Sequence, residues 1–286
     1  MLAGNGLSQA RVAVVGLGLM GGSLAMGLRG SCAALLGIDP DERTVELARQ
    51  RQVVDWAACE PGELLAQADV IVLAAPVRAI LGLLQALPEL HPGAPVVLDL
   101  GSTKRAIAAA MQALPERFDP LPAHPMCGKE QASLEHADPA IYHGAPLAFT
   151  PLVRTGERAR RIGLEIAAVL GARPLWLDPA THDRWTAATS HAVYLLANAL
   201  ACATPAETRP LVGPGFRSTA RLAPSSPGMM LDILATNSEN VLEALGRIRQ
   251  ALEALEGALA AGDLERLRER LALGAEAYAD LTTPPA

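Results

Sequence analysis

A glycine-rich segment directly after the first apolar run is the feature that most constrains the fold. Residues Arg11–Val15 form a short run of mainly apolar residues, and the next six residues read Gly16-Leu17-Gly18-Leu19-Met20-Gly21. A helical pattern follows over Gly21–Arg29. A strand that enters a helix through three glycines at this spacing predicts the first unit of a parallel α/β sheet, because a helix must return the chain before the next parallel strand can pair.

The pattern of apolar runs and helical stretches then repeats. Further strands are predicted at Ala34–Ile38, Val70–Ala74 and Val96–Leu100, and helices at Asp41–Arg51, Pro61–Ala66 and Val77–Leu87. Continuous apolar runs are typical of strands that are buried on both faces. Strands alternating with helices predict a doubly wound parallel sheet. Two weaker candidate strands, Ala145–Thr150 and Arg173–Leu177, flank a predicted helix at Glu157–Leu170 that Gly171 ends, and would continue the pattern.

The character of the sequence changes after Pro179. We expect one long apolar helix at Thr181–Ala203, an irregular Pro/Gly-rich stretch at Thr204–Gly215, a second long helix at Ser226–Leu259 and a last helix at Asp263–Ala279. Apolar residues spaced by three and four along the second long helix predict an amphipathic stripe. The sequence therefore predicts an α/β domain over residues 1–178, followed by an all-α domain over residues 179–286.

The glycine segment in this setting predicts a dinucleotide site of the Rossmann type. Gly16 permits the tight turn, Gly18 lets the backbone approach a pyrophosphate, and Gly21 lets helix and strand pack closely. The helix start at Leu19 and Met20 offers unpaired N–H groups to the phosphates. Asp39 ends the second predicted strand, where a carboxylate accepts the ribose hydroxyls of NAD and repels the 2′-phosphate of NADP. NADP stays the alternative, because Arg43 lies nearby.

The loops after the third and fourth strands should surround the nicotinamide, since ligands of such sheets lie beyond the carboxyl ends of the strands. These loops hold Ala75-Pro76 and Gly101-Ser102-Thr103-Lys104, and Ala123-His124-Pro125-Met126-Cys127-Gly128 comes next. Oxidation of an alcohol needs a base, and neutral histidine suits pH 7. His124 is placed to be this base, and Ser102 could hold the hydroxyl or the imidazole. A hydrogen-bonded structural histidine is the competing interpretation.

The other histidines are interpreted from their settings. His91, His136 and His143 lie in polar, turn-like segments and are expected at the surface. His182 stands at a helix start beside Asp183, where it could help to cap the helix. His191 lies inside an apolar helix, so core packing and function remain equal alternatives there.

Composition and charge exclude several classes of protein. The net charge of −6 argues against a nucleic-acid surface, which needs a basic stripe. The four cysteines have no C-x-x-C spacing, which indicates free thiols, and no His/Asp/Glu cluster has metal spacing. No basic leader and no stretch of ~18 uninterrupted apolar residues is visible. The sequence therefore predicts a cytoplasmic protein without metal, membrane or nucleic-acid partner.

The order of the motifs resembles the prephenate and arogenate dehydrogenases. The glycine segment, Asp99–Lys104 and His124–Gly128 are followed by Tyr142-His143-Gly144 leading to Leu147–Pro151, then by His182-Asp183, Ser190-His191 and Gly215-Phe216-Arg217 with Arg221. The resemblance runs from about Arg11 to Ala279. It implies NAD-dependent oxidative decarboxylation of prephenate or arogenate, which gives 4-hydroxyphenylpyruvate or tyrosine in tyrosine biosynthesis. It also implies a homodimer formed through the helical half.

The resemblance assigns roles to individual residues. It implies that His124 accepts the proton of the ring hydroxyl and that Ser102 hydrogen-bonds there. His191 would bind substrate, Arg221 would grip its carboxylate, and Arg217 would be a basic neighbour. Glu130 falls where the family has an acidic residue near the pocket entrance, and Lys104 is interpreted as structural or anion-steering.

Departures from the family pattern touch the substrate side. They are Ala192-Val193 for Leu-Pro, Ser218 for Asp, Ala220 for Thr and Met230 where Trp is common. Two alternatives stay open: another two-domain hydroxyacid dehydrogenase, and a dinucleotide-binding sensor without catalysis. The first would need a catalytic lysine on the first long helix, and Arg173–Leu200 contains no lysine.

Overall fold

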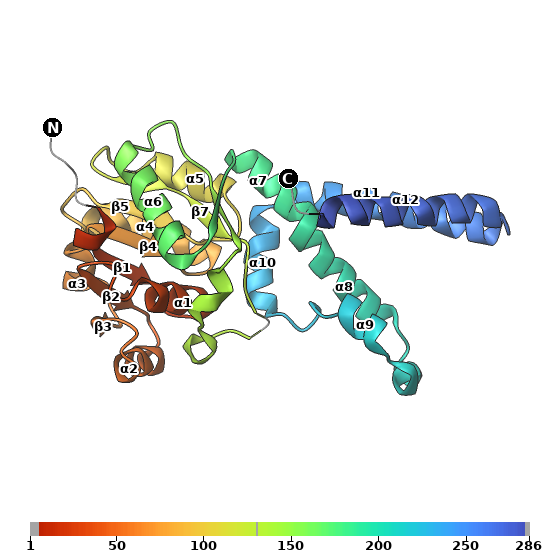
Figure 1. The fold of residues 1–286 in the computed structure, drawn as a ribbon, viewed down its shortest axis with the longest axis horizontal. Helices are drawn as coiled ribbons and strands as arrows, with labels where there is room; N and C mark the ends of the chain where they lie inside the picture. The colour runs from red at the N-terminus through yellow and green to blue at the C-terminus, as the bar shows by residue number, and fades with distance from the viewer. Residues whose placement is uncertain (1–5, 130, 284–286) are drawn as a thin grey trace. The chain divides into compact units, whose positions relative to one another are not determined.

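The computed structural model describes residues 6–129 and 131–283 (Figure 1). The chain divides into two compact units, Met1–Asn237 and Ser238–Ala286, which are described separately below. Of the helices in the described ranges, none is long and apolar enough to cross a membrane.

A six-stranded sheet forms the centre of the first unit. All its neighbouring strands pair in parallel, in the order β3-β2-β1-β4-β5-β6. The bounds are β1 Arg11–Val15, β2 Ala34–Ile38, β3 Trp56–Ala58, β4 Val70–Leu73, β5 Val96–Asp99 and β6 Asp119–Leu121. The predicted doubly wound sheet is confirmed. Its strand order reverses between β1 and β4, which is where such sheets bind their ligands.

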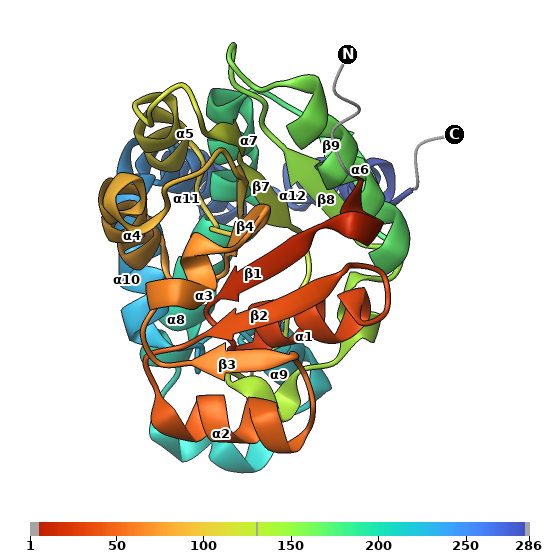
Figure 2. The same cartoon turned by 90° about the vertical axis from the view of Figure 1, so that its left-hand side faces the viewer.

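Helices cover both faces of this sheet (Figure 2). They are α1 Leu19–Leu28, α2 Glu42–Gln50, α3 Gly62–Ala66, α4 Val77–Leu90, α5 Arg105–Gln112 and α6 Glu157–Leu170. Alternate residues of β1 enter two different cores: Val12 and Val14 pack with α1, α2 and α6, and Ala13 and Val15 pack with α3, α4 and α5. Burial on both faces explains why the strands are continuous apolar runs.

A smaller sheet carries the candidate base. It pairs β7 Ala123–Pro125 antiparallel with β8 Pro146–Phe149, and β8 parallel with β9 Arg173–Trp176. The two weaker predicted strands are therefore real, but they form a second sheet and do not extend the first one. Gly171, in the left-handed conformation at φ 65°, ends α6 as the sequence indicated.

One histidine prediction is wrong. His91 is 3 % exposed, and its Nε2 lies 2.8 Å from the carbonyl oxygen of Ala68. The polar residues around it in sequence conceal a tertiary hydrogen bond that buries the ring.

The rest of the first unit is helical. It contains α7 Pro179–Thr186, a π-helical turn Ala187–His191, α8 Ala192–Ala203, a 3-10 helix Ala206–Leu211, α9 Pro214–Thr219 and α10 Pro227–Thr236. The predicted helix at Thr181–Ala203 is thus present, but it begins two residues earlier and contains a π turn. Two contacts anchor α10 beside the sheet: Arg78 Nε lies 3.2 Å from Asp232 Oδ1, and the hydroxyls of Thr103 and Thr236 are 2.8 Å apart.

The prediction of one helix over Ser226–Leu259 is also wrong. The helix stops at Thr236 and a new one, α11 Ser238–Ala260, begins after Asn237, whose φ of −135° and ψ of 25° are not helical. Apolar periodicity continues across the break, so the pattern alone could not reveal it. In the second unit α11 contacts α12 Leu264–Thr282, and the Asp263 side chain caps α12 by accepting the Arg266 N–H.

Candidate active site

The three glycines between β1 and α1 are required for different reasons. Gly16 has a φ of +96°, and a Cβ there would lie 2.4 Å from the carbonyl oxygen of Ala74. A Cβ on Gly21 would lie 1.9 Å from the Gly16 carbonyl oxygen. A Cβ on Gly18, in contrast, would have no atom within 4 Å. No neighbouring side chain explains Gly18, so the open space above it, at the N-terminus of α1, suits the close approach of a phosphate.

A cavity of about 360 Å³ opens from this turn across the carboxyl ends of β1, β4 and β5. We call it the loop cavity. The predicted cofactor residues that line it are Gly18, Leu19, Met20, Ala75, Pro76 and Ser102. Ser225, Met229 and Ile233 close its other side, from α10 and the turn before it. Its position and its glycine turn fit the pyrophosphate and nicotinamide parts of a dinucleotide.

Asp39 lies beside the glycine turn and does not line the loop cavity. One of its carboxylate oxygens accepts the Leu17 N–H at 2.7 Å, and the other accepts the Asp41 N–H at 3.0 Å. Two backbone donors therefore fix the carboxylate at the end of β2. Each oxygen keeps a second lone pair for an outside donor such as a ribose hydroxyl.

A buried ion pair holds the serine loop. Lys104 is fully buried; its Nζ donates to Asp99 and, at 2.6 Å, to the carbonyl oxygen of Ala123. Asp99 also accepts the N–H groups of Gly101 and Ala123. Burial lowers the pKa of the Lys104 ammonium, and the Asp99 carboxylate opposes this effect. These contacts join the loop that carries Ser102 to the strand that carries His124, so the role of Lys104 is structural.

A second cavity, of about 390 Å³, adjoins the first. We call it the histidine cavity, since both His124 and His191 line it. Ser102, Ser225, Met229 and Ile233 line both cavities, so a group in one lies next to a group in the other. The remaining lining residues are Pro125, Met126, Cys127, Thr189, Ser190, Tyr194, Leu222 and Met230. Half of these lining residues carry a polar side-chain group and the other half are mainly apolar, a mixture that suits a small polar ligand.

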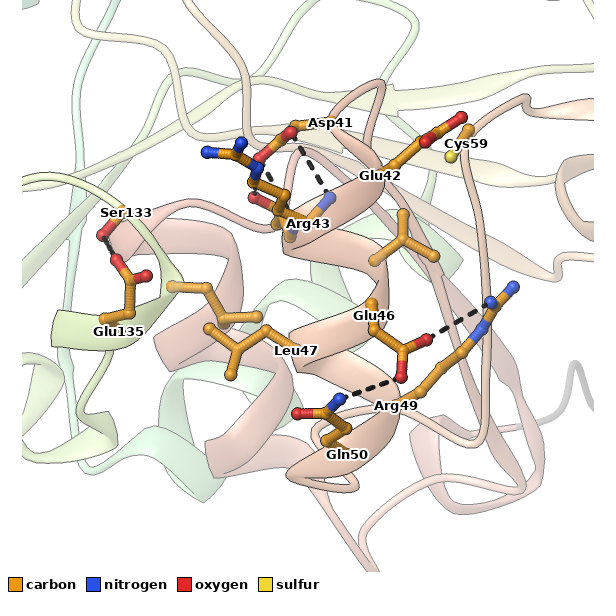
Figure 3. A pocket seen from close by; sticks show the side chains of 13 residues that line it. Asp41, Glu42, Arg43, Glu46, Leu47, Arg49, Gln50, Cys59, Ser133 and Glu135 are labelled. Atoms are coloured by element: carbon orange, nitrogen blue, oxygen red, sulfur yellow. Dashed lines mark hydrogen bonds and ion pairs between the residues drawn. The ribbon is translucent and has the colours of Figure 1, made fainter.

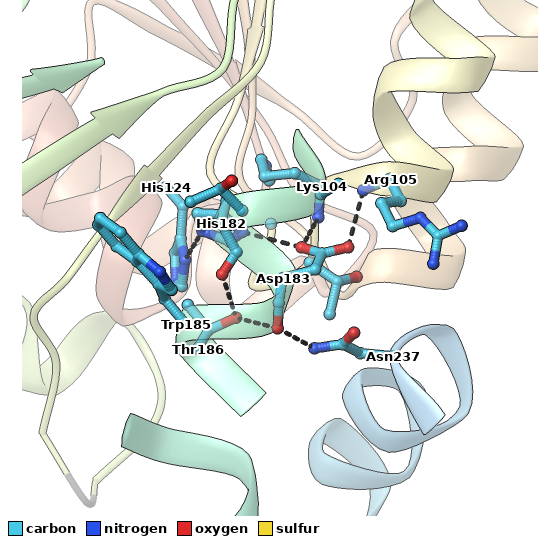
Figure 4. A network of polar contacts seen from close by, with 12 residues as sticks. Lys104, Arg105, His124, His182, Asp183, Trp185, Thr186 and Asn237 are labelled. Atoms are coloured by element: carbon cyan, nitrogen blue, oxygen red, sulfur yellow. Dashed lines mark hydrogen bonds and ion pairs between the residues drawn. The ribbon is translucent and has the colours of Figure 1, made fainter. Parts of the chain in front are cut away.

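His124 begins a chain of hydrogen bonds that leads away from the histidine cavity (Figure 4). Its Nδ1 lies 2.9 Å from His182 Nε2, and His182 Nδ1 lies 2.8 Å from Asp183 Oδ1. A carboxylate only accepts, so His182 carries its proton on Nδ1 and its neutral Nε2 accepts. His124 must then donate from Nδ1. This assignment leaves the Nε2 of neutral His124 unprotonated and able to accept a proton.

Asp183 is the fixed end of this chain. It is fully buried, and its two carboxylate oxygens also accept the N–H groups of Lys104 and Arg105, at 2.6 and 2.9 Å (Figure 4). These donors lie at the N-terminus of α5, where negative charge is stabilised. The expectation that His182 caps its helix is wrong: Asp178 caps α7, and His182 is buried within the chain of hydrogen bonds.

His191 reaches the same cavity from the π turn. In this turn the Ala192 N–H bonds to the carbonyl oxygen of Ala187, five residues earlier. The wider turn displaces side chains from α-helical spacing and is frequent at functional sites. Thr189, Ser190 and His191 all belong to it and line the cavity. His191 Nδ1 lies 3.2 Å from the amide nitrogen of Asn237.

Both cavity histidines are held neutral. Burial lowers the pKa of His124 well below 6.5, and His182, Lys104 and His191 lower it further. Burial also lowers the pKa of His191, to about 4, although Asp183 opposes the shift. A neutral imidazole is the form that can accept a proton.

The predicted arginines lie at the protein surface. Arg217 is on α9 and Arg221 follows it, and both are exposed. Neither lines the histidine cavity, although Leu222, the next residue after Arg221, does. Glu130 lies outside the described residues. The structure thus brings Ser102, His124 and His191 together, and places the two arginines outside this cavity.

A larger groove, of about 880 Å³, runs along the outer side of α2 (Figure 3). Its lining includes Asp41, Arg43, Glu46 and Glu135, and an ion pair joins Arg49 to Glu46 at 3.9 Å. It contains no histidine and no residue of the glycine turn. The loop and histidine cavities hold the glycine turn and the cavity histidines, so they are the better candidates for a reaction site.

Sequence reasoning gave no site role to three residues that organise the site: His182 and Asp183, named only as a motif of the resemblance or as a helix start, and Asn237. Asp183 and Asn237 are each 4 % exposed or less, and each bonds to a residue more than 40 positions away in sequence. The one visible signal was polar side chains within apolar helical stretches, since such groups are buried only with partners.

Two family models match the chain. "Prephenate dehydrogenase, nucleotide-binding domain" matches residues 24–174, and "Prephenate dehydrogenase, dimerization domain" matches residues 178–273. A prephenate dehydrogenase of Lactococcus lactis subsp. cremoris is 28% identical over 254 residues, which cover 85% of this chain. This match spans 69% of the relative's own length. A second match, to the prephenate dehydrogenase of Bacillus subtilis, spans 65% of that protein's length.

Solved structures resemble the whole chain. The prephenate dehydrogenase of Aquifex aeolicus, in complex with hydroxyphenyl propionate and NAD+, matches with a TM-score of 0.88 at 25% identity and covers 97% of this chain and 100% of its own. The Synechocystis arogenate dehydrogenase matches with a TM-score of 0.80 at 29% identity and covers 96% and 100%. The motifs, the fold and both domain models agree: the chain belongs to the prephenate dehydrogenase family.

Proposed function

We propose that the protein catalyses the NAD-dependent oxidative decarboxylation of prephenate or arogenate, giving 4-hydroxyphenylpyruvate or tyrosine. The observation that supports this most is the adjacency of two cavities. One carries the glycine turn of a dinucleotide site, the other carries the unprotonated Nε2 of His124, and Ser102 lines both. A substrate in the histidine cavity would meet a base and a hydride acceptor at once.

In this proposal His124 is the general base. Its Nδ1 is occupied by His182, so Nε2 is the nitrogen that takes the proton of the ring hydroxyl. The lowered pKa of His124 keeps the ring ready to accept a proton at neutral pH. His182 and Asp183 hold the imidazole in the required tautomer and stabilise the cation that forms on it, as the aspartate does in a hydrolase triad. Ser102 would orient the hydroxyl.

The proposed reaction combines a hydride transfer, a proton transfer and a decarboxylation. Bound NAD would supply the nicotinamide that accepts the hydride from the carbon bearing the hydroxyl. The hydroxyl proton passes to His124 Nε2, and the carbon–oxygen bond becomes a carbonyl. The bond to the ring carboxylate then breaks and carbon dioxide leaves. The electron pair aromatises the ring and passes to the oxygen as a phenolate, which takes the proton back from His124 Nε2 to become the phenol.

NAD is proposed as the preferred cofactor. The Asp39 carboxylate is fixed by the N–H groups of Leu17 and Asp41 at the end of β2, where a ribose hydroxyl would lie. A 2′-phosphate at that point would meet a fixed negative charge.

Arg221 and Arg217 are proposed to bind the substrate's carboxylate. Arg221 directly precedes Leu222, a residue that lines the histidine cavity, so the segment reaches the edge of the cavity. A guanidinium offers two parallel donors to a carboxylate. His191 is proposed as a further substrate contact.

A steady-state assay of two substrates against two cofactors tests the proposal. Prephenate and arogenate are each supplied with NAD and with NADP, and both the reduced cofactor and the aromatic product are measured. We expect turnover with NAD and at least one substrate, with equal amounts of reduced cofactor and product. Absence of turnover with all four pairs, in protein that binds NAD, would refute the proposed activity.

We also propose a domain boundary near residue 178, which divides a dinucleotide-binding domain (1–178) from a helical substrate and dimerisation domain (179–286).

A homodimer is proposed as well. Large apolar side chains are exposed on both helices of the second compact unit: Leu242, Leu252, Leu259, Leu264, Leu271, Leu273, Tyr278 and Leu281. Exposed apolar surface of this kind generally marks an interface. Light scattering at micromolar concentration should give twice the chain mass of 29.8 kDa, and a mass of one chain would refute the dimer.

A further inference from the structure

Asn237 is a buried amide at the end of α10, and its contacts converge on the histidine cavity. It is 4 % exposed. Its Nδ2 lies 2.7 Å from the carbonyl oxygen of Asp183 and 3.2 Å from Nδ1 of His191 (Figure 4 shows the first of these contacts). The residue therefore joins the backbone of α7 to the ring of a cavity histidine.

The orientation of the amide follows from its partner. A backbone carbonyl oxygen only accepts, so the amide atom that faces Asp183 must be the NH₂ group. That group has two hydrogens, and the second one faces His191 Nδ1. His191 Nδ1 must then accept, and the proton of the neutral ring stands on Nε2.

The opposite assignment holds for His124. Its Nδ1 donates to His182, which leaves Nε2 as an acceptor, as derived above. Asp183 determines the tautomer of both histidines. Its carboxylate orients the chain of hydrogen bonds through His182 to His124, and its carbonyl oxygen orients the Asn237 amide that contacts His191. The two histidines line one cavity and leave the same ring nitrogen for a ligand, but in opposite protonation states.

We infer that Asn237 is a positioning residue that holds His191 in the Nε2–H tautomer, so that the histidine cavity presents one accepting nitrogen, on His124, and one donating nitrogen, on His191. The group that binds at His191 is then a hydrogen-bond acceptor, such as a carboxylate or carbonyl oxygen of the substrate. An ammonium or a hydroxyl proton is not accommodated there. This inference deepens the proposed function and depends on it only for its kinetic test.

The direct test uses the whole protein without substrate. Solid-state NMR of protein labelled with ¹³C,¹⁵N-histidine reports which ring nitrogen carries a proton, and His191→Gln and His124→Gln variants assign the two signals. We expect a proton on Nε2 of His191 and on Nδ1 of His124 at neutral pH. A His191 ring protonated on Nδ1 would overturn the inference, whatever the protein catalyses.

Two variants of Asn237 test the cause. Asn237→Asp has the same shape but offers an acceptor, so a proton should appear on His191 Nδ1. Asn237→Leu removes the donor, so a mixture of tautomers is expected. The matched control is Thr236→Val, which removes the contact with Thr103 beside Asn237 but does not touch His191. An unchanged His191 signal in both Asn237 variants, with thermal melting showing that they fold, would overturn the assignment.

The kinetic test separates positioning from general damage. Loss of one neutral hydrogen bond should raise KM for prephenate by roughly three- to tenfold in Asn237→Leu. The kcat should fall much less, since His124 keeps its own partners, and affinity for NAD should not change. An equal fall in kcat and in NAD affinity would indicate structural damage and contradict the positioning role. If the NMR result holds but no variant or wild type turns over, the proposed activity fails and the tautomer assignment stands.

Discussion

The two adjoining cavities differ in whether backbone or side-chain groups determine their hydrogen-bonding properties. One side of the loop cavity is formed by backbone segments: a glycine turn, the N-terminus of α1 and the ends of parallel strands. The histidine cavity depends on buried side chains that hold one another, from His124 through His182 to Asp183 and from Asn237 to His191. Backbone donors have fixed positions and need few partners. Imidazoles have two tautomers, and only neighbouring donors and acceptors select one.

This difference predicts where each region is vulnerable. In the glycine turn beside the loop cavity a single added methyl group collides with backbone, as at Gly16 and Gly21. In the histidine cavity a substitution can leave the shape intact and still change which nitrogen carries a proton. Variants that keep the shape of a side chain but alter its charge or tautomer therefore test this comparison.

The largest effect is expected for His124→Asn. Loss of the general base should lower kcat by on the order of 10²–10⁴. Affinity for NAD should be kept, because the glycine turn is untouched. Steady-state rates with prephenate and a binding titration with NAD check both parts. A variant that turns over near the wild-type rate would show that His124 is not the base.

A smaller effect is expected for Arg221→Ala. A charged hydrogen bond to a carboxylate contributes about 1.5–3 kcal/mol, so KM should rise by about ten- to a hundredfold. Arg221→Lys should restore only part of this, since an ammonium lacks the two-pronged geometry of a guanidinium. The measurement is a substrate titration at saturating NAD. An unchanged KM would mean that the carboxylate is held elsewhere, and Arg217→Ala would then be the next variant.

The variant Asp39→Asn should lower the cofactor preference, which is the kcat/KM with NAD divided by the kcat/KM with NADP, by about tenfold. The asparagine oxygen can still accept the Leu17 N–H of the glycine turn, whereas its NH₂ group loses the contact with the Asp41 N–H, and the negative charge is removed. The preference for NAD should fall. A ratio that stays the same, or a wild type that already prefers NADP, would contradict the role of Asp39 and direct attention to Arg43.

The smallest effect is expected from pH. The pKa of His124 is lowered, so the base is already deprotonated at pH 6.5 and stays so above it. The kcat/KM should be flat from pH 6.5 toward neutrality and should fall only when the pH drops well below 6.5. A rise of kcat/KM centred near pH 6.5 would contradict a desolvated His124.

Four strands of the large sheet (β1, β2, β4 and β5) and the cofactor loops could be predicted from sequence because their signals are local, whereas the three-residue strands β3 and β6 were not foreseen. A buried parallel strand is a continuous apolar run, and a tight turn at φ +96° requires glycine at Gly16. The position of His124 and Ser102 beside a cavity was expected on the same local grounds, since both lie beyond or beside strand ends, and their roles stay predictions. The second sheet was not foreseen, because three-residue strands such as β7 leave little pattern.

The partners of the histidines could not be predicted in the same way. The break at Asn237 and the burial of His182 depend on contacts between residues 46 to 79 positions apart. Apolar periodicity describes one helix at a time and carries no information on such pairs. His191 shows the limit clearly: its position in an apolar helix fits both core packing and function, and the sequence shows neither the cavity that it lines nor its contact with Asn237.

The central claim is that Asp183 acts on the reaction through His124, and a double-mutant cycle tests it most directly. Single variants His124→Asn and Asp183→Asn and the double variant are compared for kcat, with NAD affinity and thermal melting as folding controls. His182→Gln serves as a second way to break the same chain of hydrogen bonds. We expect Asp183→Asn to lower kcat by roughly 10- to 100-fold in the wild-type background and to have little further effect once His124 is absent, because residues that act as a unit are not additive. Losses that multiply in the double variant would show that Asp183 acts independently of His124 and would contradict the account.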